Sequence, residues 1–152
     1  MSDQLIPAVS GVTPASIAAF VEEQWPDAPP VVCEEVSGRH VIVARTVPFS
    51  AIRPGGFISG PTQFGLADLA LWYACFGAIG LEAMALTSEM SIRFVRPATG
   101  PILRARADLH SVGKRNIVGT VTLWTDDVDR PTAVCQGTYV APQVQLRTDE
   151  AT

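Results

Sequence analysis

The most regular pattern in the chain is the alternation of apolar and polar residues over 103–110. A period of two places the apolar side chains on one face of a β-strand. Alternation, β-branched residues and intervening turn residues predict five more strands. The six expected strands span residues 31–36, 40–47, 89–94, 103–110, 116–125 and 132–141.

Near the N-terminus, apolar residues recur at helical spacing instead. Thr13 suits the N-cap position and Pro14 suits the first helical position. The prolines that begin at Pro26 cannot continue a helix. A short N-terminal helix is therefore predicted between Thr13 and Pro26.

A second helix is predicted from Pro61 to about Gly77 or Gly80, and it is apolar on almost every side. Residues 64–81 approach the length of a membrane span. The segment contains Asp68 and three glycines, and the half-buried strand patterns elsewhere need a core to pack on. We therefore expect a buried central helix and no membrane partner.

The predicted order is helix, two strands, apolar helix and four strands. The last three connections are short, which predicts an antiparallel meander of the last four strands. An apolar helix of about 17 residues, near 25 Å long, can cover one face of such a sheet. The 152 residues therefore predict one α+β domain, residues 1–152, with its core at about 31–141 and a polar tail at 143–152.

Composition narrows the possible partners and the compartment. The net charge of −4 gives no reason to expect a nucleic-acid partner. Three cysteines without a CxxC pair favour neither a disulfide framework nor a zinc site. Residues 1–11 have no basic segment followed by an apolar run, so we expect no signal peptide and a cytoplasmic protein.

Asp68 is the only charged residue between Pro61 and Leu81. It lies too deep in the helix to act as an N-cap, and burying an unpaired carboxylate costs several kcal/mol, on the order of 3–5. One interpretation is a general base or nucleophile that lines a dry pocket. The other is a structural aspartate bonded to backbone N–H groups or to Arg53 or Arg93.

The segment before this helix, residues 49–60, is a glycine-rich loop. Its glycines allow the backbone to approach a ligand closely, and N–H groups at a helix start can stabilise an oxyanion. Gly60 precedes Asp68 by roughly two helical turns. We expect the Gly60 amide and the Asp68 carboxylate to flank one substrate carbonyl.

Three motifs resemble a known family. The run Ser-Gly-Pro-Thr-Gln-Phe-Gly-Leu-Ala-Asp at 59–68 resembles the signature of hotdog-fold thioesterases of the phenylacetate-degradation (PaaI-like) type. That signature is His-Gly-Gly followed after a few residues by Phe-x-Leu-Ala-Asp. The Phe-x-Arg-Pro run at 94–97 and the Gly-Lys pair at 113–114 are also similar to this family. The resemblance spans about residues 31–141.

The resemblance implies a long antiparallel sheet wrapped around a central helix. It also implies acyl-coenzyme A thioesters as substrates, and a homodimer or homotetramer with active sites at the dimer interface. Asp68 would be the base or nucleophile, and the Gly60 amide the oxyanion donor. No metal is required, and coenzyme A enters only as part of the substrate.

The chain departs from the family pattern at three positions. Ser59 replaces the family histidine, and Pro61 replaces the second glycine and has no N–H. Arg53 stands where the family often has an asparagine, and it is available to pair with Asp68 or to hold an anionic substrate. These departures leave open a protein that binds acyl-coenzyme A without hydrolysing it. A hydratase or dehydratase of the same fold is a further alternative, although such enzymes generally use a histidine that this loop and helix lack.

Two sets of binding residues are expected, since loops carry function and basic groups bind phosphate. The substrate set is Arg53, Phe57, Ile58, Ser59, Gln63 and Phe64. The coenzyme A set is His110, Gly113, Lys114 and Arg115. Trp72 is expected to lie in the core, with the option of shaping an acyl pocket, and His40 to be exposed or half-buried on its strand.

Overall fold

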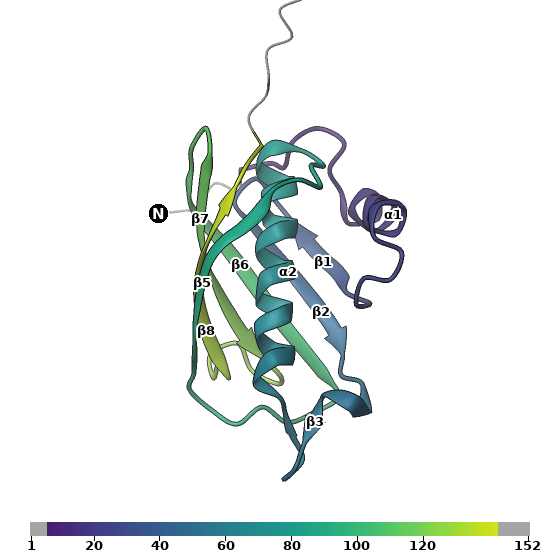
Figure 1. The fold of residues 1–152 in the computed structure, drawn as a ribbon, viewed down its shortest axis with the longest axis vertical. Helices are drawn as coiled ribbons and strands as arrows, with labels where there is room; N and C mark the ends of the chain where they lie inside the picture. The colour runs from purple at the N-terminus through teal and green to yellow at the C-terminus, as the bar shows by residue number, and fades with distance from the viewer. Residues whose placement is uncertain (1–5, 143–152) are drawn as a thin grey trace, which may run out of the picture.

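A long helix, α2 (Gly60–Ile79), lies across a six-stranded antiparallel sheet, as Figure 1 shows for the computed structural model. A shorter helix, α1 (Pro14–Gln24), lies to one side, next to the first strand. The structure describes residues 6–142, so the predicted polar tail at 143–152 and the first five residues lie outside it. This arrangement confirms the predicted α+β class and the central helix.

The six long strands lie close to the predicted ranges. They are β1 (Val32–Val36), β2 (His40–Thr46), β5 (Leu86–Phe94), β6 (Ile102–Val112), β7 (Asn116–Trp124) and β8 (Ala133–Val140). The glycine-rich loop has more structure than expected: a 3-10 turn (Phe49–Ala51) precedes a small hairpin of β3 (Ile52–Arg53) and β4 (Phe57–Ile58).

Helix α1 begins and ends as its sequence predicts. The Thr13 hydroxyl accepts a hydrogen bond from the Ser16 amide at 3.1 Å, and Pro14 is the first helical residue. Ser16 bonds back to the Thr13 backbone, which completes a capping box. The helix stops at Gln24, two residues before Pro26.

The predicted meander of the last four strands is wrong at its first strand. The sheet order is β1-β2-β6-β7-β8-β5, so β5 pairs with β8, while β2 takes the place beside β6. The connection over residues 95–101 can span about 23 Å when extended, and three strand spacings require only about 14 Å. Its backbone is held on the way, since the Ala98 carbonyl accepts from the Ile58 amide and the Pro101 carbonyl from the Val47 amide, both at 2.8 Å.

The core lies between α2 and the concave face of the sheet. Leu71 of α2 packs over Gly119 and Gly137, which are paired in register on β7 and β8. A Cβ built on Gly119 or Gly137 would lie 2.8 or 2.7 Å from a Leu71 methyl carbon. The helix can therefore approach the sheet this closely only because both strand positions are glycine.

His40 is buried, at 6% exposure, which corrects the expectation that it is exposed or half-buried. The Ser37 hydroxyl lies 2.7 Å from His40 Nδ1 and also accepts the His40 amide at 3.0 Å. The Ser37 turn therefore folds the imidazole inward at the start of β2.

All three cysteines are buried and free, as expected from their spacing. Burial raises the pKa of the Cys75 thiol to about 12 and the pKa of Cys33 and Cys135 to about 11. Across residues 6–142, no helix is long and apolar enough to cross a membrane.

Candidate active site

Asp68 lies in the third turn of α2 and is half-buried against the last strands of the sheet. The Thr87 hydroxyl donates to Asp68 Oδ1 at 2.7 Å, and the Tyr139 hydroxyl makes a second, short hydrogen bond to the same oxygen. The Tyr139 hydroxyl also lies 2.9 Å from the Asp68 carbonyl oxygen. No ion pair joins Asp68 to any residue in 6–142, so the alternative of a structural aspartate paired with Arg53 or Arg93 does not hold within one chain.

Tyr139 remains a neutral hydrogen-bond donor at ordinary pH. Burial and the neighbouring Asp68 carboxylate raise the pKa of the Tyr139 phenol well above its usual value. Both hydroxyls converge on Oδ1, and Oδ2 accepts no hydrogen bond within the described residues. One carboxylate oxygen is thus anchored while the other is available for chemistry.

The start of α2 leaves one amide free. Ser59 is the N-cap, and its hydroxyl accepts from the Thr62 amide at 3.3 Å and bonds to the Thr62 hydroxyl at 2.8 Å. Pro61 has no N–H to offer. Within residues 6–142 the Gly60 N–H has no acceptor, so it is the free first-turn donor that an oxyanion requires.

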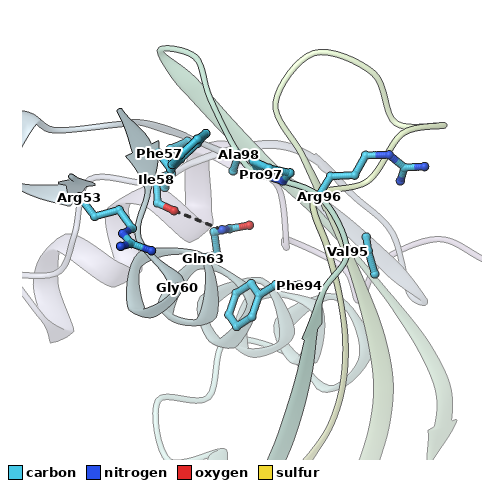
Figure 2. Close-up of a pocket in the computed structure, with 10 residues that line it drawn as sticks. All are labelled: Arg53, Phe57, Ile58, Gly60, Gln63, Phe94, Val95, Arg96, Pro97 and Ala98. Carbon is cyan, nitrogen blue, oxygen red and sulfur yellow. Dashed lines mark hydrogen bonds between the residues drawn. The ribbon is translucent and has the colours of Figure 1, made fainter. Parts of the chain in front are cut away.

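Gly60 lines a cavity of about 550 Å³ between the β3–β4 hairpin, the start of α2 and the end of β5 (Figure 2). Four of the six predicted substrate residues line this cavity: Arg53, Phe57, Ile58 and Gln63. The other two, Ser59 and Phe64, do not. The cavity is lined by Arg53, Phe57, Ile58, Gly60, Gln63, Phe94, Val95, Arg96, Pro97 and Ala98.

Two polar side chains of this cavity are occupied elsewhere. The Gln63 amide group donates to the Ile58 carbonyl at 3.4 Å and accepts the Thr132 hydroxyl at 3.0 Å, so it braces the loop against the sheet. Arg96 donates to the Pro131 carbonyl at 3.2 Å and points away from Gly60 in Figure 2. Arg53 forms no ion pair with any described residue and points toward the start of α2.

Asp68 lines a different cavity, of about 390 Å³, over the outer face of α2. Its wall is mostly apolar and aromatic, and it includes Trp72, which the sequence analysis left as an option for an acyl pocket. The cavity is lined by Trp25, Pro29, Arg45, Gly65, Asp68, Leu69, Trp72, Ala83, Ala85, Leu86, Thr87 and Tyr139. Gly60 and Asp68 are about 12 Å apart along the helix axis, so one chain alone does not bring them to a common carbonyl.

The predicted coenzyme A residues lie together at the exposed hairpin between β6 and β7. Gly113, Lys114 and Arg115 are exposed there, and His110 Nε2 lies 2.7 Å from the Thr120 hydroxyl. This hairpin is at the same end of the sheet as Thr87, since Asn116 and Leu86 both pair with Val140. It is at the opposite end from Gly60, which lies against Phe94.

Sequence reasoning missed Thr87, Tyr139 and Arg45. Alternation along β8 places Tyr139 on the face that covers the helix, so a signal for it was present. Thr87 lay outside the predicted strand, and a bulge between Thr87 and Glu89 breaks the alternation there. Arg45 follows Val41 and Val43 at the same alternation on β2, which predicts that it faces the helix.

Comparison with known proteins places the chain in a family. Residues 55–132, just over half of the chain, match the model of the thioesterase superfamily. The chain belongs to the thioesterase superfamily. Among curated proteins no match was found.

Solved structures agree with this membership. A candidate thioesterase from Silicibacter sp. TM1040 is 28% identical to the present chain, with a TM-score of 0.80. The match covers 91% of the present chain and 96% of the Silicibacter chain. The E. coli PaaI protein of the phenylacetic acid degradation operon is 24% identical (83% and 94% covered, TM-score 0.69). Zebrafish thioesterase superfamily member 2 is 18% identical (87% and 100% covered, TM-score 0.73). The last two, at these identities, show that the hotdog fold is shared.

Among residues 6–142 of this thioesterase-superfamily chain, no three His, Cys, Asp or Glu side chains come together as a metal site.

Proposed function

We propose that the protein hydrolyses acyl-coenzyme A thioesters, with Asp68 as base or nucleophile and the Gly60 amide as oxyanion donor. The observation that carries the proposal is the geometry of Asp68. Its Oδ1 is held by Thr87 and Tyr139, its Oδ2 is free, and the carboxylate borders an apolar cavity. Membership in the thioesterase superfamily supports the same reaction class.

We further propose that the site forms between two copies of the chain. Strand β5 is one of the two edge strands of the sheet and is exposed along most of its length, including Leu86 and Phe94 at its two ends. Such an edge has unpaired backbone groups that can pair with another strand. When two β5 strands pair antiparallel, the Phe94 end of one copy lies beside the Leu86 end of the other.

This pairing would bring the two halves of the site together. Gly60 lies against Phe94, since a Cβ built on Gly60 would be 3.2 Å from Phe94 Cζ. Asp68 is bonded to Thr87, next to Leu86. The Gly60 cavity of one subunit would therefore face Asp68 of the partner subunit, which supports a homodimer or a homotetramer made of two such dimers.

Two routes use these groups. Asp68 Oδ2 either attacks the thioester carbonyl, forming an anhydride that water then opens, or removes a proton from a water that attacks. In both routes the carbonyl oxygen becomes an oxyanion that the Gly60 N–H stabilises, and the C–S bond breaks as the coenzyme A thiolate leaves. The basic hairpin at 113–115 is the proposed contact for the coenzyme A phosphates, and the three buried thiols favour a reducing, cytoplasmic setting.

The test is free-thiol release from short, medium, long and aromatic acyl-coenzyme A thioesters. Asp68→Asn should lower kcat by about 10²–10⁴ with little change in ligand affinity, because a general base contributes this much. Tyr139→Phe should lower kcat about tenfold or more, since a hydrogen bond to a charged group contributes about 1.5–3 kcal/mol. Asp129→Asn, in the exposed β7–β8 hairpin, is the matched control and should keep the wild-type rate. Equal rates for wild type and Asp68→Asn would refute the assigned role.

A non-catalytic acyl-coenzyme A binding protein is the second candidate, and one observation favours it. The Ser59 hydroxyl is bonded to Thr62 at the helix cap, and Pro61 has no N–H, so the chain lacks both the histidine and the second glycine amide of the family pattern. Tight binding of acyl-coenzyme A with no thiol release from any substrate would favour this function over hydrolysis.

A further inference from the structure

The cavity beside Asp68 extends across the exposed face of α2. Asp68 is bonded to Thr87 on β5 and to Tyr139 on β8, on one flank of the helix. Arg45, on the opposite flank, belongs to β2, which is three strand spacings from β8, or about 14 Å measured across the strands. It is also displaced along the strands, since Arg45 pairs with Leu103 near the start of β6 and Tyr139 is level with Val112 near its end. The apolar wall between them includes Leu69 and Trp72 of α2 and Trp25, which follows α1.

Arg45 has a buried nitrogen without a partner among the described residues. Within residues 6–142 its Nε donates no hydrogen bond to any group, and its guanidinium forms no ion pair. Arginine is always charged, and a buried charged donor without a partner costs free energy. The alternation of β2 explains why the Arg45 stem covers apolar surface, but that packing leaves the Nε–H unpaired.

We propose that this cavity takes acyl groups that end in a carboxylate, and that Arg45 binds this carboxylate while the thioester carbonyl lies at Asp68. The inference rests on the proposed thioester hydrolysis. A carboxylate accepts two parallel hydrogen bonds from a guanidinium, and Arg45 lines the cavity from which such a carboxylate would approach. Repulsion by Asp68 favours the same orientation, because it directs the anionic end of the acyl group toward Arg45.

The experiment compares matched thioesters that differ only at the end of the acyl chain. The pairs are glutaryl- with pentanoyl-, adipoyl- with hexanoyl-, and suberoyl- with octanoyl-coenzyme A, assayed by thiol release with the full chain. In at least one pair, wild type should favour the carboxylate-ended member about tenfold or more in kcat/KM, as expected for a charge-assisted hydrogen bond. Arg45→Met should abolish this preference, with the loss falling on the carboxylate-ended substrate.

Two further variants distinguish a specific contact of Arg45 with the carboxylate from a nonspecific effect of positive charge on the protein. Arg45→Lys should keep part of the preference, because lysine retains the charge but not the bidentate geometry. Arg39→Met removes an exposed arginine from the β1–β2 turn and should keep the full preference. Melting temperature and oligomeric state are measured for each variant. A destabilised Arg45→Met that keeps the wild-type preference would make Arg45 a structural charge and overturn the inference.

The remaining outcomes separate the two proposals. Methyl-ended substrates that are hydrolysed as fast as or faster than their partners in every pair would overturn the role of Arg45 and leave hydrolysis standing. No thiol release from any substrate would refute the proposed function instead. In that case, binding of the same pairs is measured by calorimetry with wild type and Arg45→Met. Wild type should bind the carboxylate-ended member of at least one pair about tenfold more tightly, and Arg45→Met should lose this preference; equal affinities would overturn the role of Arg45.

Discussion

A site shared between two subunits predicts that two inactive variants restore each other. Asp68→Asn disables the carboxylate half of the site. Gly60→Leu places a large side chain in the cavity of about 550 Å³ that Gly60 lines, and the atoms nearest to its Cβ belong to the ring of Phe94, a half-exposed side chain that can move. Each homodimer should be nearly inactive, while each variant subunit keeps one intact half.

The expected magnitude follows from counting sites. In a mixed dimer, Gly60 of the Asp68→Asn subunit faces the intact Asp68 of the other subunit, so one of the two sites is complete. Random exchange makes about half of the dimers mixed, which predicts about one quarter of the wild-type rate per subunit. A site built within one chain predicts no recovery, because neither variant then contains both groups.

The assay is thiol release before and after the two purified variants are unfolded together and refolded. Differently tagged subunits and native mass spectrometry measure the fraction of mixed dimers, and wild type carried through the same cycle sets the full rate. Mixed dimers that are no more active than the parent variants would refute the shared site.

Two further predictions concern stability. Gly137→Ala should destabilise the protein by about 1–2 kcal/mol in urea unfolding, because its new methyl group would lie 2.7 Å from Leu71. Adding Leu71→Ala should recover part of that loss, and strictly additive effects within about 0.5 kcal/mol would contradict the packing argument. An unfolded thiol ionises near pH 9.0, whereas the folded Cys75 thiol stays neutral to about 12. The contribution of this buried thiol to the free energy of unfolding should therefore be steady below about pH 8 and fall by about 1.4 kcal/mol between pH 8 and 10, because the unfolded thiol loses its proton first. Cys75→Ala should reduce this fall, and an unchanged pH dependence would contradict it.

Local signals were sufficient for most of the elements. Thr13 and Pro14 mark the start of α1, and the alternation over 103–110 gives the buried and exposed faces of β6, because each depends only on nearby residues. Asp68 could be singled out for a similar reason, since it is the one charge in a long apolar segment. The family motifs around it pointed to the superfamily that the chain belongs to.

The positions of β5 and of the site halves depended on distant contacts. A seven-residue connection can join neighbouring strands or span three strand spacings, and only the pairing of β2 with β6 excludes the first. The hydroxyls on Asp68 come from Thr87 and Tyr139, far along the chain and in part hidden by a bulge. The sequence alone thus determined the elements, the family and the carboxylate. The tertiary structure decided which groups surround that carboxylate, that Gly60 lines another cavity, and that Arg45 is unpaired, because these facts depend on packing between segments that no local pattern connects.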